Sequence, residues 1–165
     1  MKDPCIHLLQ YDHWANVKLL EHIDQIQEDI FHKTLDSVFP TISETFYHIY
    51  RAHRIWFKRC LPLLALDESV TEFHSIEHAK NSFNDLYPIL IDAIDEHYVE
   101  LGKIVYQNQK GTTFENEFDD IIHHLANHGT YHRGNIAAMI RQNGCKGTST
   151  DYIQYLRDVP RSSSR

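Results

Sequence analysis

Apolar residues recur at helical spacing over four long stretches of the chain. Polar and charged residues fill the remaining positions of each stretch, which is the pattern of helices that bury one face against a shared core. The predicted helices cover residues 4–26, 42–61, 75–101 and 117–143. Together they indicate an all-α protein whose fold is a four-helix bundle.

Local signals mark several of the helix ends. Thr41 and Glu44 form a capping box at the start of the second helix, and Asn116 is the expected N-cap of the fourth. Gly102 follows the third helix at a position suited to the left-handed conformation, and Gly144 ends the fourth helix. These signals support four separate helices with defined ends.

Residues 103–115 interrupt the helical pattern. Two β-prone arms, 103–106 and 112–115, flank a glycine-bearing turn, which predicts a small β-hairpin before the last long helix. Near the C-terminus, aromatic and aliphatic residues at 152–156 indicate a short docked helix. With no internal repeat and no long linker, we expect one domain over residues 1–158, followed by a disordered Ser/Arg-rich tail at 159–165.

Composition excludes several classes of function. The net charge is −7, from 16 Lys and Arg against 23 Asp and Glu, which is the wrong sign for general binding to DNA or RNA. No apolar run is long enough for a membrane span or a signal peptide, so we expect a cytoplasmic protein without membrane contact. Cys5, Cys60 and Cys145 are widely spaced and form no CxxC pair, which indicates reduced thiols.

Histidine is the unusual feature of the composition, with 13 residues. His128 and His132 lie four apart on the fourth helix, close enough to hold one ion. His132 falls on the apolar arc of that helix and His128 at its edge, whereas His123 falls on the solvent side. Two inward imidazoles would each need polar partners, and a shared cation would satisfy both. The pair is therefore a candidate metal site.

A third ligand is expected from a facing helix, because two imidazoles do not hold a metal tightly. In the second helix, His48 and His53 both lie opposite the charged arc, and periodicity does not choose between them. The small neighbours Thr45 and Ala52 leave space beside His48 and favour it modestly. His13 in the first helix is a weaker candidate.

One segment makes the chain recognisable. The run HLANHGTYHRGNIAAMIRQNG, residues 124–144, closely resembles the signature of the DinB-like family of bacterial metal-binding four-helix bundles. Three shorter segments resemble other elements of that family: residues 11–16, 42–49 and 150–157. With them the resemblance covers nearly the whole chain. The resemblance implies a DinB-like bundle with a metal triad of His48, His128 and His132.

The resemblance also assigns roles near the triad. It implies a packing or supporting role for His53. For His124 it makes a supporting role as plausible as the alternative, which is that His124 is only a partly exposed polar residue. Asn135 stands where the family commonly has Gln, which leaves the role of that amide open. Arg133 follows His132 and could reach an anionic substrate group or form an ordinary surface salt bridge.

Three neutral imidazoles leave a metal ion its full charge and an open position, as in catalytic sites. Imidazole ligands suit zinc, nickel, copper and iron alike, and the expected cofactor is one divalent ion, zinc or nickel. Related branches of the family resemble thiol-dependent transferases and isomerases, in which the metal would activate a low-molecular-weight thiol such as bacillithiol or mycothiol. The leading hypothesis is therefore S-transfer to a small electrophile, with the thiol as co-substrate. A metal-dependent hydrolase and a non-catalytic stress-response protein are the alternatives, and no Glu lies between His128 and His132 as in an HExxH helix.

Two aromatic residues bear on assembly. Tyr11 and Trp14 project from the first helix on the side opposite its leucines. They indicate either a partner surface, with a homodimer as the expected assembly, or a surface covered by the bundle or by the C-terminal segment. The two alternatives are evenly balanced.

Overall fold

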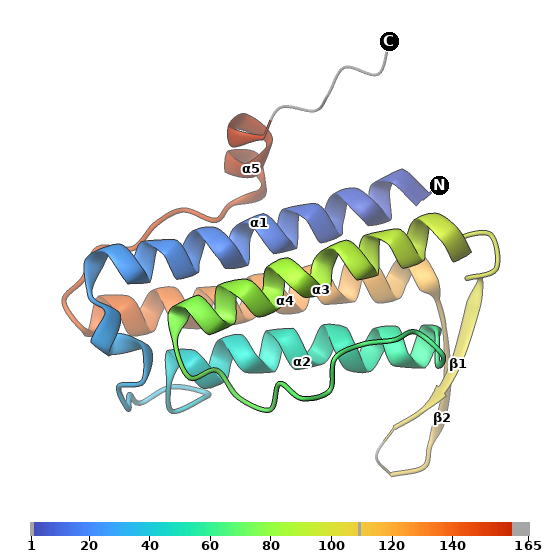
Figure 1. The fold of residues 1–165 in the computed structure, drawn as a ribbon, viewed down its shortest axis with the longest axis horizontal. Coiled ribbons are helices and arrows are strands. Elements are labelled where there is room, and N and C mark those ends of the chain that lie inside the picture. Colours follow the sequence, from blue (N-terminus) through green and yellow to red (C-terminus); the bar gives the residue numbers. More distant parts are fainter. Residues whose placement is uncertain (1, 109, 160–165) are drawn as a thin grey trace.

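Four long helices lie alongside one another and form the body of the protein (Figure 1). The computed structural model describes residues 2–108 and 110–159. The long helices are α1 (Lys2–Ile26), α2 (Ile42–Cys60), α3 (Ile76–His97) and α4 (Phe118–Gln142). A 3-10 turn, η1 (Glu28–Phe31), follows α1, and a short helix, α5 (Tyr152–Asp158), lies near the C-terminus. The predicted all-α bundle with one hairpin is confirmed.

The direction of the helices follows from one long connection. In Figure 1, α2 and α3 run the same way, because residues 61–75 return along the bundle between them. Helix α1 packs mainly against α3 and α4, and α4 packs against both α1 and α2. Consequently α4 buries two faces, one toward each neighbour.

The core between the helices is apolar and rich in aromatic rings. Phe46 and Phe83 are fully buried with ring centroids 6.2 Å apart, and Leu90 and Ile136 are also inaccessible to solvent. Burial of each such side chain contributes roughly 1.5–3 kcal/mol relative to exposure. This core fixes the helices on which the polar sites described below are built.

Two of the predicted helix ends are confirmed. The Thr41 hydroxyl accepts a hydrogen bond from the backbone N–H of Glu44 at 3.1 Å, as a capping box requires. Gly144 has a φ of +76°, and the N–H of the next residue bonds back to the Ile140 carbonyl at 3.2 Å. The prediction for Gly102 is wrong, because its φ is not positive and α3 already ends at His97.

The hairpin consists of β1 (Lys103–Gln107) and β2 (Thr113–Glu117), paired antiparallel. Its existence is confirmed, but Asn116 is not the N-cap of α4, because it lies within β2 opposite Ile104. The strand continues directly into the helix, and the N–H of Phe118 is bound by the Gly102 carbonyl at 2.9 Å. Figure 1 shows the hairpin at the end of the bundle where α2 finishes.

Helix α5 packs across the outside of α1. Tyr155 is buried against Tyr11 and Trp14, with ring centroids 5.7 and 5.5 Å away. The C-terminal segment therefore packs on the aromatic face of α1, which is one of the two alternatives for this surface, and the homodimer stays a prediction. Of the predicted tail, residues 160–165 lie outside the described residues. No described helix combines the length and the apolar character that crossing a membrane requires.

Candidate metal centre

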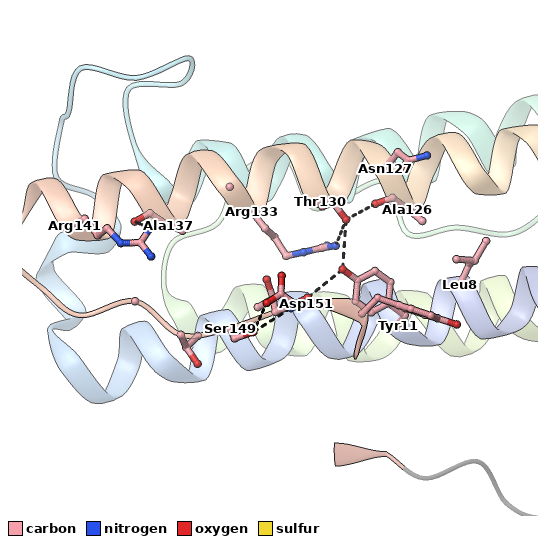
Figure 2. A pocket seen from close by; sticks show the side chains of 15 residues that line it. Leu8, Tyr11, Ala126, Asn127, Thr130, Arg133, Ala137, Arg141, Ser149 and Asp151 are labelled. Atoms are coloured by element: carbon pink, nitrogen blue, oxygen red, sulfur yellow. Dashed lines mark hydrogen bonds between the residues drawn. The ribbon is translucent and has the colours of Figure 1, made fainter. Parts of the chain in front are cut away.

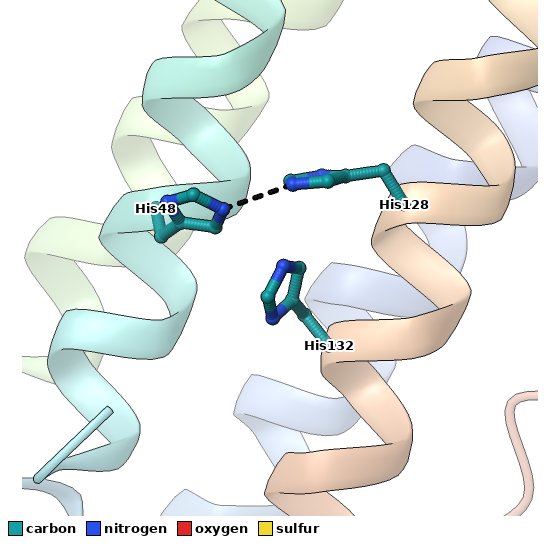
Figure 3. A group of neighbouring side chains, drawn as sticks. All are labelled: His48, His128 and His132. Carbon is teal, nitrogen blue, oxygen red and sulfur yellow. Dashed lines mark hydrogen bonds between the residues drawn. The ribbon is translucent and has the colours of Figure 1, made fainter. Parts of the chain in front are cut away.

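Three histidine side chains from two helices converge at the interface of α2 and α4 (Figure 3). His48 projects from α2, and His128 and His132 project from adjacent turns of α4. One ring nitrogen from each lies within 4.8 Å of the others, and the Nε2 atoms of His48 and His128 are 2.9 Å apart. The structure therefore brings together the three residues that the sequence indicated as a triad.

All three imidazoles are held in the neutral form. Burial first, and then repulsion from the charged forms of His132 and His48, lower the pKa of His128 to about 3. Burial, together with His48, lowers the pKa of His132 to about 4. The pKa of His48 is also lowered, first by burial and then by the charge of Arg51. Neutral imidazoles carry the free lone pairs that a metal ion needs.

The arrangement fits a first-row divalent ion. Ligand nitrogens bound to zinc in a tetrahedral site lie about 3.4 Å from one another, given bonds of about 2.0–2.1 Å. The observed separations, from 2.9 Å to no more than 4.8 Å, require only small side-chain adjustments. In addition, the Nδ1 atoms of His128 and His132 are buried, and neither has a hydrogen-bond partner among the described residues. The atoms that face each other in the His48–His128 pair are Nε2, so these are the lone pairs that a cation between the two rings would use.

The centre is covered on one side and open on another. Phe39, in the segment before α2, lies 4.7 Å from the His48 ring and 5.6 Å from the His132 ring. His132 is buried, whereas His48 and His128 keep partial exposure. A small molecule could therefore reach the group beside His128, but not from the side that Phe39 covers. No periodicity could have predicted this contact, because residue 39 lies outside the four helical segments.

The structure separates His53 from the triad. His53 is fully buried, donates from Nδ1 to the Ile49 carbonyl at 3.0 Å, and directs Nε2 toward α1 and α3. There Nε2 lies 3.2 Å from Asp12 Oδ2 and 3.3 Å from the Tyr87 hydroxyl. His53 thus belongs to a buried polar cluster behind the three histidines.

Arg133 belongs to the same buried cluster. Only 2% of Arg133 is exposed, and its guanidinium donates to Asp12 Oδ1, to Asn16 Oδ1 at 3.0 Å and to the Thr130 hydroxyl at 3.1 Å. Both alternatives considered for Arg133, a surface salt bridge and a contact with substrate, require an exposed guanidinium, and this one is buried. In the structure its partner is instead the fully buried carboxylate of Asp12.

The charges in this cluster stabilise one another. Burial by itself would raise the pKa of Asp12, but the Arg133 guanidinium and the contacts with His53 and Tyr87 hold it well below the usual range. Burial likewise favours neutral Arg133, and the charge of Asp12 outweighs it and raises the pKa of Arg133. The pair is therefore ionised, and it joins α1 to α4 inside the bundle.

The remaining candidates take no part in the three-histidine group. His124 is exposed and contacts the Trp56 ring at 5.3 Å. His13 stacks on Tyr87 at 4.8 Å and bonds to Asn84 of α3. Asn135 is half-buried, and its Nδ2 atom has no hydrogen-bond partner among the described residues. No hydrogen bond joins Asn135 to the three histidines, so the structure gives that amide no role in the centre.

A cavity of about 710 Å³ lies on another side of α4, between α4, α1 and residues 147–152 (Figure 2). Its polar groups largely satisfy one another: Tyr11 donates to the Thr150 carbonyl at 3.0 Å, and Thr130 donates to the Ala126 carbonyl at 2.9 Å. None of the three converging histidines lines it. The histidine group is therefore the stronger candidate for chemistry.

Comparison with known proteins places this geometry in a family. The model of the DinB family matches residues 1–161. The chain belongs to the DinB family. The DinB protein of Bacillus subtilis (strain 168) is 32% identical over 164 residues, which cover 94% of this chain and 95% of that protein. The sequence-based resemblance is thereby confirmed.

The DinB fold is also supported by a solved structure. The crystal structure of a DinB-like protein from Bacillus cereus ATCC 10987 aligns with a TM-score of 0.64 over 85% of this chain and 91% of that one, at 15% identity. At that identity the likeness concerns the fold. The three-histidine group of this DinB-family chain rests on its own geometry.

Proposed function

We propose that His48, His128 and His132 bind one divalent transition-metal ion, and that the protein uses it as an enzyme. The observation that carries the proposal is the convergence of three neutral imidazoles, from two helices, at a partly exposed position. Imidazole ligands suit zinc and nickel, which are the expected ions. Three protein ligands are typical of catalytic sites, whereas structural zinc sites have four.

The proposed reaction is transfer of a low-molecular-weight thiol, such as bacillithiol or mycothiol, to a small electrophile. A divalent ion in this position would lower the pKa of a thiol and so supply the nucleophilic thiolate at neutral pH. In the overall reaction a sulfur–carbon bond forms, the leaving group departs with the bonding electrons, and the thiol proton passes to solvent.

The residues of the chain support this reaction by position and environment. Burial keeps the three ligands neutral, so that they reduce none of the charge of the ion. Phe39 shields one side of the group from water. Arg133 and Asp12 hold α4 against α1, and thereby fix the turn that carries His128 and His132.

Two measurements test the proposal. Elemental analysis of untagged protein should give one zinc or nickel ion per chain. Metal-free and metal-loaded protein are then supplied with bacillithiol and 1-chloro-2,4-dinitrobenzene, and we expect thioether formation above the uncatalysed rate in the loaded protein alone.

The other outcomes have defined meanings. Loss of chloride that is independent of thiol would indicate a metal-dependent hydrolase. Stoichiometric metal without turnover of this or other thiol and electrophile pairs would favour a metal-binding protein of the stress response. Absence of metal binding would overturn the proposal as a whole.

A further inference from the structure

A continuous row of aromatic side chains leads away from the three-histidine group. The His124 ring lies 5.8 Å from His128, Trp56 lies 5.3 Å from His124, Tyr106 lies 4.9 Å from Trp56, and Phe114 lies 5.9 Å from Tyr106. We call His124, Trp56, Tyr106 and Phe114 the ring row. It joins α4, α2 and both strands of the hairpin.

The ring row keeps access to solvent. His124 is exposed, Phe114 is 44% exposed, and Trp56 and Tyr106 are half-buried. Packing between α2 and α4 does not depend on these rings alone, because the buried side chains of Phe57 and Phe118 also pack against each other. An aromatic surface that remains accessible beside a candidate metal centre is the type of lining found in small-molecule sites.

Arg59 gives the ring row a positive charge. Its guanidinium carbon lies 4.6 Å from the Trp56 ring centroid and 5.0 Å from that of Tyr106. Within residues 2–108 and 110–159, no carboxylate forms an ion pair with Arg59. The row therefore disfavours cationic ligands and favours neutral or anionic ones.

We propose that the ring row is the substrate-binding surface of the metal centre, and that it selects molecules with a metal-binding group at one end and a flat aromatic body at the other. The inference rests on the proposed function. Two ring-to-ring steps, of 5.8 and 5.3 Å, separate His128 from Trp56, and a fused two-ring system joined to a metal-binding group spans them. Stacking on Trp56 and His124 then supplies affinity that a short ligand lacks.

Isothermal titration of zinc-loaded protein with two hydroxamates tests this inference without any assay of activity. Acetohydroxamate reports on the open metal position alone, and 2-naphthohydroxamate adds a flat bicyclic body. We expect the naphthyl compound to bind about tenfold more tightly to the wild type. In Trp56→Leu the gain should fall to about twofold, while zinc content and acetohydroxamate affinity stay unchanged.

Two further variants control the comparison. Trp14→Leu removes the other tryptophan, which packs on Tyr155 of α5 and not on the three-histidine group. This variant should keep the tenfold gain in affinity for the naphthyl compound. Trp56→Phe retains a ring at the same position and should keep most of it. Equal gains in wild type and Trp56→Leu, or no gain in the wild type, would overturn the ring row as a binding surface.

The two levels of the inference fail in different ways. If zinc binds but acetohydroxamate does not, the open position assumed by the proposed function is absent and the inference falls with it. If acetohydroxamate binds and the naphthyl body adds nothing, the metal centre stands and the substrate surface alone is refuted.

Discussion

Gly129 of α4 faces the Asp12 side chain of α1, and its replacement by alanine should destabilise the protein. A Cβ atom at this position would overlap Asp12 Oδ1 and lie 2.7 Å from Arg133 Nη1. Both side chains are buried and ionised, and neither can leave its partner for water. Alanine must therefore separate the ion pair or push the two helices apart.

The expected magnitude follows from two opposing contributions. Breaking a buried ion pair costs about 3–5 kcal/mol, because an uncompensated charge is left in the interior. Alanine in place of glycine within a helix returns about 1 kcal/mol through helix propensity. The free energy of unfolding should therefore fall by about 2–4 kcal/mol in Gly129→Ala, a large share of the stability of a single domain.

Urea unfolding followed by circular dichroism measures this change, and the same helix supplies the control. A Cβ atom at Gly134 would have no atom within 4 Å. Gly134→Ala should therefore leave stability unchanged or raise it by up to about 1 kcal/mol. The reasoning would be refuted by a Gly129→Ala protein as stable as Gly134→Ala, since the two differ only in what the added methyl group meets.

Three further predictions follow from the geometry. His128→Ala should abolish stoichiometric metal binding in elemental analysis, and His123→Ala, an exposed residue on the same helix, should retain it; equal occupancy in both would exclude the proposed centre. Asp12→Asn should be less stable than the wild type, by an amount that is constant above about pH 5 and shrinks below about pH 4. The pKa of Asp12 is lowered in the folded protein, so the unfolded chain takes up the proton first as the pH falls, and the ionised carboxylate then stabilises the wild type less. A stability difference that is independent of pH from 6 to 3 would contradict this. Thr41→Ala should lower the free energy of unfolding by about 1 kcal/mol in urea titrations, through loss of the α2 cap, and an unchanged midpoint would show that the cap contributes nothing.

Periodicity predicted the helices because the burial of their apolar faces is the main determinant of the fold. It also identified the inward position of His132, which the structure confirms as buried. The hairpin was recognised from β-prone residues around a glycine, and Gly111 has a φ of +77° in that turn. The start of α4 was predicted wrongly, since Asn116 is a residue type that often caps helices but here lies in a paired strand.

The choice between His48 and His53 shows what periodicity leaves undetermined. Both residues lie on the inward side of α2, and the pattern measures only their angle from the polar face. In the structure His48 faces α4, whereas His53 reaches toward Asp12 of α1 and Tyr87 of α3. Which neighbour a buried side chain meets depends on helix packing, which periodicity does not determine.

The buried polar cluster was missed because its members look like surface residues one at a time. Asp12 and Asn16 are four apart and fall on the same arc of α1 as its buried leucines, which was the available signal. Arg133 falls beyond the narrow apolar arc of α4. That helix contacts both α1 and α2, so that its buried surface is wider than one arc and includes the arginine.

Two parallel rows of residues on adjacent turns of α4 connect this cluster to the metal centre. His128 and His132 are four apart and face α2, and Gly129 and Arg133, each one residue further along, meet Asp12 of α1. The absence of a side chain at residue 129 allows the Asp12 carboxylate to reach the helix, and the arginine one turn later neutralises it. The ion pair therefore fixes the distance of α4 from α1, and with it the position from which the two imidazoles face His48 across the bundle.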